Sequence, residues 1–472
     1  MANLKSLAKD TAIYGLSSIL GRFLNYLLVP LYTAKMSAQS GGYGVITNMY
    51  ALTALLLVLL TFGMETTFFR FANKEGENPQ RVFSTALIGV TSAATLFFCL
   101  VLLFLAPVSQ FLGYSETPQY VWVMAATVAI DAIRAIPFAF LRQQKKALKF
   151  AALQLLNIGI NIALNVAYYV GLDGHDPGYA FYINMVCSAV VTLCLAKELT
   201  SLRHGFDTSL MRRMLVYAWP IVVLGIAGVL NQVADKILFP FVYPGDDMRE
   251  QLGIYGACVK IAMIMAMITQ AFRYAYEPFV FGKTRDQDND TVQAQAMKYF
   301  VIFTLLAFLC VMGWLDVLKL IIPDAYRVGL CVVPIVMAAE IMMGIYFNLS
   351  FWYKLTDKTI WGALFSGVGC AVLIAINVFF VPHYGYIACA WAGFAGYGVA
   401  MTLSYIVGQH YHPIRYPLGA IIFYVLLAVV VWASMDYLHN CLPLWASLGY
   451  NSVAIICFVA IIIRKDLLKA RK

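Results

Sequence analysis

Long apolar stretches alternate with short polar connections along nearly the whole chain of 472 residues. An α-helix needs about 18–25 mainly apolar residues to cross the hydrocarbon layer of a bilayer. By this pattern we predict fourteen membrane-spanning helices. They cover residues 11–34, 45–69, 82–106, 119–141, 150–170, 179–199, 214–242, 252–280, 297–314, 328–351, 359–381, 386–408, 416–438 and 442–463. The first span lacks a small-residue cleavage pattern, so we expect no cleavable signal peptide.

Composition supports a lipid environment for most of the chain. Hydrophobic residues make up 62% of the sequence and charged residues 12%, and the mean hydropathy is +0.77. Ordinary soluble domains do not have this balance. Since no loop on the predicted outer side is long enough to fold separately, the function is expected to reside in the helices.

The distribution of basic residues predicts the orientation. With the N-terminus placed in the cytoplasm, the cytoplasmic segments carry 24 Lys and Arg residues and the outer segments carry 4. Such a bias sets the topology of membrane proteins, and it predicts that both termini are cytoplasmic. The net charge of +9 therefore reflects topology and does not indicate nucleic-acid binding.

A weak internal repeat runs through the first twelve spans. A shift of 212 residues places Tyr43-Gly44 on Tyr255-Gly256 and Asn165 on Asn377. We therefore predict two six-span lobes in the same orientation, at residues 1–205 and 206–410, followed by a helix pair at 411–472. Parallel lobes of this kind are suited to alternating access around a central site.

Apart from Lys197 and Lys298, which lie at the ends of their spans, five basic residues lie inside predicted spans: Arg22, Arg134, Lys236, Lys260 and Arg273. A cation near the bilayer centre costs roughly 2.5–3.5 kcal/mol on insertion scales. Cations kept at this depth usually face a water-filled cavity and an anionic partner. The five residues therefore predict a cationic cavity that binds a negatively charged substrate.

Some of these cations also have a structural interpretation. Arg22, with Asn25 on the same helical face, contacts a phosphate or snorkels to the cytoplasmic interface. Arg273 pairs with Glu277 or contacts the ligand. Lys260 has no acid nearby in the sequence, which favours a ligand contact.

Three acids inside the spans are candidates for ion coupling: Asp131, Asp235 and Glu340. Asp131 lies three residues before Arg134, so these two side chains can instead neutralise one another. Glu340 is either a proton or cation site or a partner of a cation such as Lys260. Coupling to H⁺ or Na⁺ remains open at this point.

The fifth span carries an amide stripe, which consists of Gln154, Asn157, Asn161 and Asn165. Their spacings of three, four and four residues place them on one helical face along about 16 Å. Amides can bind sugar hydroxyls without the desolvation cost of a charge, so these four residues and Asn25 of the first span are the candidate sugar contacts. They can equally hold helices together by hydrogen bonds.

Enzyme signatures are absent from the sequence. It contains no phosphate-binding glycine loop, no metal-ligand spacing and no nucleophile elbow. We predict a protein that is not an enzyme and that needs no cofactor or metal.

The opening residues resemble a known family. The matching features are Gly21-Arg22, Pro30-Leu31-Tyr32-Thr33, the G-x-Y-G of residues 41–44, and Gly63 followed by Arg70-Phe71. With fourteen spans in two lobes, the chain resembles the polysaccharide-transport family, which contains the O-antigen and capsule flippases. That family belongs to the multidrug/oligosaccharidyl-lipid/polysaccharide (MOP) exporter superfamily.

The resemblance implies an all-α, V-shaped fold with a cationic cavity between two lobes, to which Arg22 carries over. It implies a flippase in the bacterial inner membrane that moves undecaprenyl-diphosphate-linked oligosaccharide outward for polysaccharide synthesis. The last two spans would hold the prenyl tail. Partners would be membrane lipids and the polymerase and glycosyltransferases of the pathway, and the protein would act as a monomer. The alternatives are a cation-coupled multidrug antiporter of the same superfamily and, from another class, a membrane polysaccharide polymerase or ligase.

Overall fold

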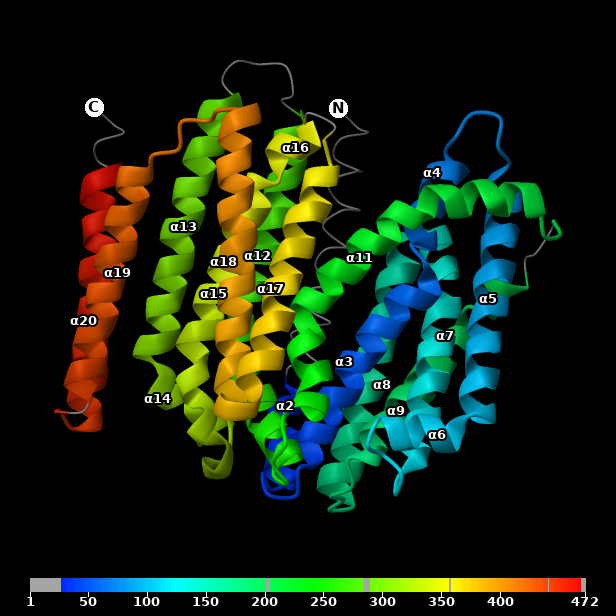
Figure 1. Ribbon diagram of the computed structural model, residues 1–472, viewed down its shortest axis with the longest axis horizontal. Helices are drawn as coiled ribbons and strands as arrows, with labels where there is room; N and C mark the ends of the chain where they lie inside the picture. Colours follow the sequence, from blue (N-terminus) through cyan, green and yellow to red (C-terminus); the bar gives the residue numbers. More distant parts are fainter. Residues whose placement is uncertain (1–26, 201–203, 283–288, 356–357, 440, 468–472) are drawn as a thin grey trace. The chain divides into compact units, whose positions relative to one another are not determined.

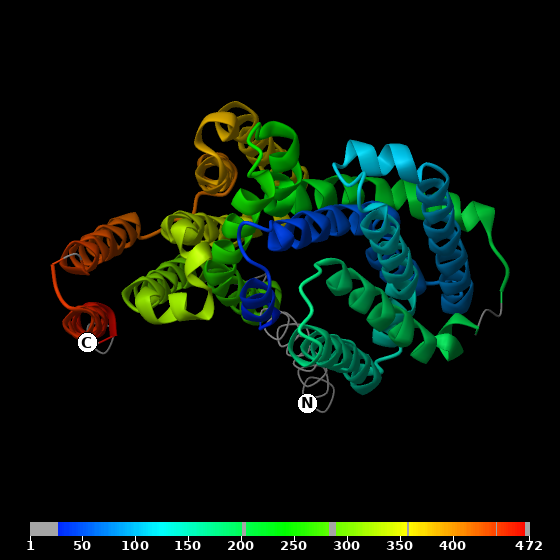
Figure 2. The ribbon, with the colours of Figure 1, turned by 90° about the horizontal axis from the view of Figure 1, so that it is seen from below.

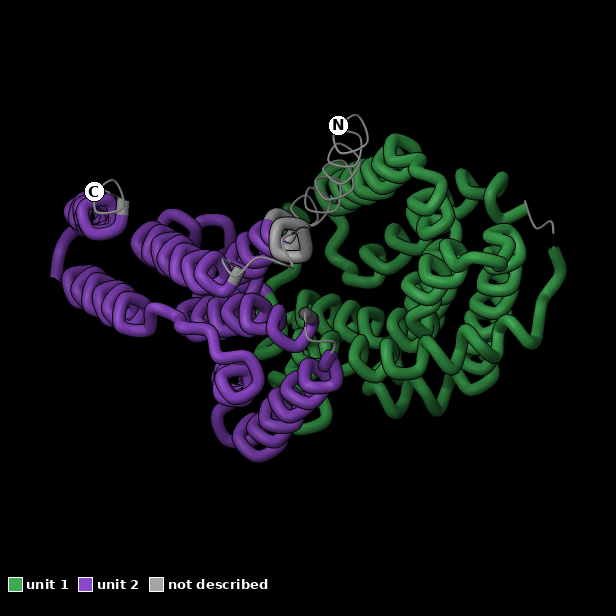
Figure 3. Tube along the Cα trace, turned by 90° about the horizontal axis from the view of Figure 1, so that it is seen from above, with its two compact units in different colours: residues 1–256 green, residues 257–472 purple. Residues whose placement is uncertain are grey.

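The computed structural model describes residues 27–200, 204–282, 289–355, 358–439 and 441–467, and within these ranges it is helical without any strand (Figure 1). The chain divides into two compact units, residues 1–256 and 257–472 (Figure 3). The division falls inside one continuous helix, α12 (Met248–Gly282). The prediction of an all-α membrane fold is confirmed.

Unit 1 contains ten further described helices. They are α2 (Leu28–Lys35), α3 (Gly42–Thr61), α4 (Met64–Ala72), α5 (Pro79–Leu103), α6 (Leu105–Phe111), α7 (Pro118–Gln143), α8 (Ala147–Val166) with the π-helical η1 (Ala167–Gly171), α9 (Gly178–Cys194), α10 (Ala196–Leu199) and α11 (Thr208–Val242).

Unit 2 continues from α12 to the last described residue. Its elements are α13 (Asn289–Gly313), α14 (Leu315–Leu318), η2 (Lys319–Ile321), η3 (Asp324–Val332), α15 (Val333–Leu349), α16 (Phe351–Leu355), α17 (Ile360–Tyr384), α18 (Tyr386–Tyr411), α19 (Leu418–His439), α20 (Leu444–Ile462) and η4 (Ile463–Leu467).

Twelve segments of the described chain are long and apolar enough to cross a membrane. The predicted first span lies mostly outside the described residues, and the sixth corresponds to α9, which has 17 residues. The count of fourteen therefore stays a prediction. The predicted span at 45–69 corresponds to the candidate span Gly42–Ala72. Within it, Phe62 and Gly63 both adopt left-handed backbone angles and separate α3 from α4.

Helix α7 lies at the centre of unit 1. It packs against α3, α4, α5, α8 and α9, and 67% of the residues in its most apolar stretch are buried. The corresponding stretch of α5 is 22% buried. A polar side chain on α7 is therefore surrounded by protein and needs partners from within the bundle.

The two copies of the G-x-Y-G sequence bring α3 and the start of α12 into close backbone contact. A Cβ atom at Gly44 would lie 1.9 Å from the carbonyl oxygen of Arg249 and 3.1 Å from the nitrogen of Gly253. One at Gly256 would lie 2.4 Å from Oγ1 of Thr47. Small residues at such crossings let membrane helices approach closely. The repeated glycines thus have a packing role at this contact.

In unit 2, α17 and α18 pack along their lengths, and their closest approach also depends on glycine. A Cβ atom at Gly369 would lie 2.7 Å from the carbonyl oxygen of Gly396, and one at Gly396 would lie 2.8 Å from that of Gly369. Helix α15 packs against α18 and α13.

Helices α19 and α20 lie side by side and pack on α13 (Figures 1 and 2). Near one end of α13, Lys298 pairs with Asp466, which also accepts a hydrogen bond from Tyr424. At the other end, Asn451 Nδ2 donates to the carbonyl of Gly313 at 2.9 Å. Polar contacts at both ends therefore fix the register of the helix pair on unit 2.

We predict that Gly44→Ala destabilises the protein because the new methyl group meets the backbone of α12. The melting temperature in detergent, followed by fluorescence-detected size exclusion, is expected to fall by several degrees. Gly159→Ala in α8 is the control, since a Cβ atom there meets no atom within 4 Å. Equal melting temperatures for the two variants would contradict the role assigned to Gly44.

Candidate functional site

The first pair of predicted site residues lies in α7. Arg134 Nη2 is 3.0 Å from Oδ1 of Asp131, and the two side chains are 17% and 15% exposed. They lie one helical turn apart, so a single helix supplies both the charge and its counter-ion. This internal neutralisation lowers the cost of placing an ion pair in a span.

A second internal pair lies in α11, where Asp235 and Lys236 are consecutive. Lys236 Nζ is 3.0 and 2.9 Å from the two carboxylate oxygens of Asp235. Tyr255 of α12 donates its hydroxyl hydrogen to Oδ2 of Asp235 at 2.6 Å. We call Asp235, Lys236 and Tyr255 the Asp235 triad.

The Asp235 triad is joined to α3 and to the α6–α7 connection. Asn48 Nδ2 donates to the carbonyl oxygen of Lys236 at 2.9 Å, and Tyr114 donates to Oδ1 of Asn48 at 2.9 Å. The Arg249 guanidinium lies 5.4 Å from the centre of the Tyr114 ring and donates to the carbonyl of Gly113. One polar network therefore connects α3, α11 and α12.

Sequence reasoning missed Asn48 and Tyr114 and gave Tyr255 no role at the site. Tyr255 could have been found, because it belongs to the second G-x-Y-G and lies 19 residues after Lys236. Asn48 is a polar residue in an apolar span, which is a detectable signal. Tyr114 lies in a connection and carried no signal of its own.

The structure divides the amide stripe of α8. Asn165 is fully buried, accepts a hydrogen bond from Tyr32 of α2 at 2.8 Å and donates to the carbonyl oxygen of Asn161 at 2.8 Å. These two amides therefore contribute to helix packing. Gln154 and Asn157 are partly buried, and Oδ1 of Asn157 has no hydrogen-bond partner among the described residues. Sugar contact stays a prediction, and among these four amides Gln154 and Asn157 are the residues with side chains left for it.

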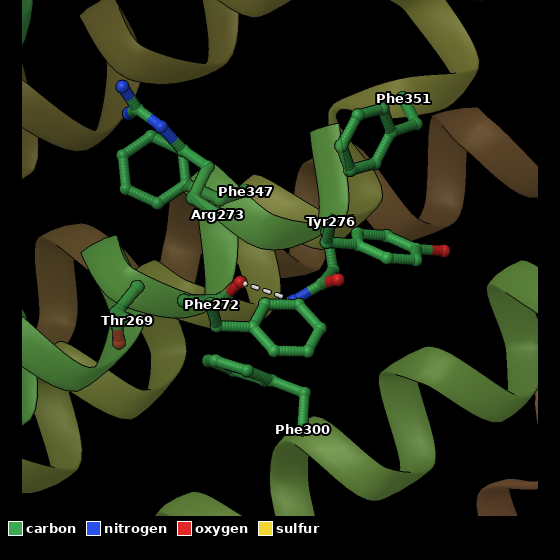
Figure 4. Close-up of a pocket in the computed structure, with 9 residues that line it drawn as sticks. Thr269, Phe272, Arg273, Tyr276, Phe300, Phe347 and Phe351 are labelled. Carbon is green, nitrogen blue, oxygen red and sulfur yellow. Dashed lines mark hydrogen bonds between the residues drawn. The ribbon is translucent and has the colours of Figure 1, made fainter. Parts of the chain in front are cut away.

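Unit 2 holds the remaining described candidates. Lys260 in α12 and Glu340 in α15 are both partly buried. The Arg273 guanidinium lies 5.0 Å from the centre of the Phe347 ring, which Figure 4 shows beside it. A small hollow lies beside Arg273 and Phe347, and neither Lys260 nor Glu340 lines it. Its lining residues are Thr269, Phe272, Arg273, Tyr276, Phe300, Gly344, Phe347, Asn348 and Phe351.

The structure does not bring all predicted residues into one described site. Arg22 and Asn25 lie outside the described residues, as does the side chain of Glu277. Asp131, Arg134, Asp235 and Lys236 belong to unit 1, whereas Lys260, Arg273 and Glu340 belong to unit 2. Unit 1 thus contributes two cations whose charges are balanced by acids of the same helices.

Carboxylates in the connections outside the spans have lowered pKa values. At the start of α11, the backbone N–H of Leu210 and the Ser209 hydroxyl lower the pKa of Asp207. In the α11–α12 connection, Gln251 and Tyr243 donate to Asp247 and lower its pKa. These aspartates are ionised at neutral pH and cap helix ends or turns.

Comparison with known structures identifies the fold. The chain is similar to the lipid II flippase MurJ in an inward closed conformation, with a TM-score of 0.77 and 14% identity over 96% of this chain and 99% of that one. It is also similar to an inward-facing multidrug resistance MATE family transporter, with a TM-score of 0.65 and 15% identity over 82% and 93%. For the MATE multidrug transporter DinF-BH, the TM-score is 0.63 and the identity 17% over 86% and 96%.

The chain therefore has the fold of the MOP superfamily of membrane transporters. The sequence profile of the polysaccharide biosynthesis protein family matches residues 7–275. The protein belongs to this family. No curated protein matches the chain.

We predict that Asp131→Leu destabilises the protein strongly, because it leaves the Arg134 charge without its partner inside the bundle. Breaking a buried ion pair on one side typically costs roughly 3–5 kcal/mol. The double variant Asp131→Leu/Arg134→Leu is expected to be more stable than Asp131→Leu alone, as measured by thermal melting in detergent. A double variant no more stable than Asp131→Leu would show that the ion pair is not the relevant interaction.

Proposed function

We propose that this protein is a flippase for undecaprenyl-diphosphate-linked oligosaccharide. It moves the repeat units of an O-antigen, capsule or exopolysaccharide from the cytoplasmic to the outer leaflet of the bacterial inner membrane. Both termini lie in the cytoplasm, and the protein acts as a monomer. Its partners are membrane lipids and the polymerase and glycosyltransferases of the pathway.

One observation carries this proposal. A chain of the polysaccharide biosynthesis family has a fold that matches 96% of its length to a lipid II flippase and 99% of the flippase itself. The MATE transporters compared above match 82% and 86% of the chain. The lipid II flippase thus matches a larger share of this chain than these MATE transporters do.

The chemistry of the spans supports the same proposal. A diphosphate with attached sugars cannot enter hydrocarbon without a large desolvation cost. A hydrated site with cations replaces the lost water contacts by charge-assisted hydrogen bonds, while the prenyl tail remains in lipid. The cations Arg22, Arg134, Lys236, Lys260 and Arg273 are the source of these bonds in our proposal.

Sugar contacts and ion coupling complete the proposed mechanism. Gln154 and Asn157 bind sugar hydroxyls, since Asn161 and Asn165 already bond to one another and to Tyr32. Asp131, Asp235 or Glu340 couples transport to H⁺ or Na⁺. An inside-negative potential also favours export of an anion, by about 2.3 kcal/mol per charge per 100 mV.

We predict that Lys260→Ala and Arg22→Ala each reduce flipping at least tenfold, because each removes a cation from the diphosphate site. The assay uses proteoliposomes that contain a fluorescent undecaprenyl-diphosphate-linked oligosaccharide, and it measures the fraction accessible to an external quencher over time. Lys260→Arg keeps the charge and should retain more activity than Lys260→Ala.

Lys74→Ala is the matched control, because Lys74 is an exposed cation in the connection between α4 and α5. Full activity in Lys260→Ala and Arg22→Ala would contradict the cationic site. Export of cationic drugs without glycan flipping would instead favour the multidrug antiporter. Chain elongation by the purified protein would favour the polymerase or ligase.

A further inference from the structure

We propose that the Asp235 triad is a counter-ion exchange site, in which the diphosphate of the substrate takes Lys236 from Asp235 while Tyr255 holds the released carboxylate. The inference rests on the proposed function for the identity of the anion. It assigns Asp235 and Tyr255 as residues that set the charge selectivity of this site.

The geometry of the Asp235 triad provides the first step. Both carboxylate oxygens of Asp235 lie within 3.0 Å of Lys236 Nζ, and one of them also accepts from Tyr255 at 2.6 Å. The side chain of Lys236 is 16% exposed and that of Asp235 is 10% exposed. Lys236 therefore has an anionic partner of its own before any substrate arrives.

The charge balance provides the second step. Asp235 and Lys236 together carry no net charge. A monoanion that replaces Asp235 is attracted to Lys236 no more strongly than the carboxylate it displaces. A diphosphate carries at least two negative charges, and its attraction to the ammonium group exceeds that of one carboxylate at the same distance. A diphosphate can therefore displace the Asp235 carboxylate from Lys236, whereas a monoanion cannot.

The released carboxylate needs a partner, which is the third step. Asp235 is buried, and a buried charge without a hydrogen-bond donor is costly. Tyr255 already donates to Oδ2, and this bond survives when Lys236 leaves. The Tyr255 hydroxyl therefore lowers the cost of exchange.

Exchange also changes the contact between helices. The backbone of Lys236 is bonded to Asn48 of α3, and Tyr255 lies between Gly253 and Gly256, which contact Gly44 and Thr47 of α3. A shift of Lys236 away from Asp235 therefore acts on the helices that form the α3–α12 crossing. Binding of the anion and packing of this crossing are linked through the same residues.

The exchange model predicts effects of opposite sign for two conservative substitutions. Asp235→Asn removes the competing charge, so farnesyl diphosphate should bind about tenfold more tightly. Tyr255→Phe removes the donor to the released carboxylate, so the same ligand should bind several-fold more weakly. Lys236→Met should weaken binding further than Tyr255→Phe does.

The measurement is calorimetric titration of the full chain in nanodiscs of zwitterionic lipid. Farnesoate, which has the same tail and one negative charge, is the comparison ligand and should bind poorly to the wild type. Asp247→Asn and Tyr243→Phe are matched controls, since this second Tyr–Asp pair lies in the α11–α12 connection. Both controls should bind farnesyl diphosphate as the wild type does.

A purely structural Asp235 triad would make both substitutions weaken binding or leave it unchanged, and either result overturns the proposal. If Asp235→Asn fails to fold, the comparison of ligands decides: a wild type that binds farnesoate as tightly as farnesyl diphosphate, or unchanged affinity for farnesyl diphosphate in Tyr255→Phe, overturns the proposal. If the two substitutions change the affinity in opposite directions but the protein does not flip the glycan lipid, the exchange site is supported and the proposed substrate is contradicted. If the protein flips the glycan lipid but the two substitutions do not change the affinity in opposite directions, the proposed substrate is supported and the exchange site is contradicted.

Discussion

A charge inside a membrane-spanning bundle needs an opposite charge within reach, and this constraint shapes unit 1. Arg134 is balanced by Asp131 one turn away, and Lys236 is balanced by the adjacent Asp235. Because each pair lies within one helix, the helix is nearly neutral before it packs. The pairs then need only hydrogen bonds from neighbouring helices, and Tyr255 provides one for Asp235. The same pairing leaves each of these cations with one carboxylate partner, which a diphosphate would have to displace in the exchange that we propose.

Local sequence was sufficient to predict most helices and one of these pairs. Apolar length predicted spans such as α5 and α17, since lipid demands continuous helices of that length. The three-residue spacing of Asp131 and Arg134 indicated their contact, because such residues share a helical face. The break at Phe62 and Gly63 could not be predicted, since a glycine within an apolar run does not reveal a left-handed backbone.

Contacts between segments far apart in the sequence could not be predicted from residue spacing, which reports only on neighbours within one helix. The bond from Tyr32 to Asn165 joins residues 133 positions apart, and that from Asn48 to Lys236 joins residues 188 positions apart. The amide stripe shows the consequence. Four amides on one face looked equivalent in sequence, but in the described residues Asn165 is fully buried and bonded to Tyr32 of α2, whereas Gln154 and Asn157 are partly buried. Which polar residues serve packing depends on the neighbouring helix.

Packing and candidate function occur together at the start of α12, where the second G-x-Y-G sequence lies. In each half, an asparagine donates to the carbonyl four residues earlier: Asn165 to Asn161 and Asn377 to Leu373. The two G-x-Y-G sequences both place glycines at the close contact of α3 and α12. Tyr43 lies beside Tyr32, and Tyr255 bonds to Asp235. At the second G-x-Y-G the tyrosine bonds to an ionisable group, so a change in charge at Asp235 can act directly on the helix packing at this contact.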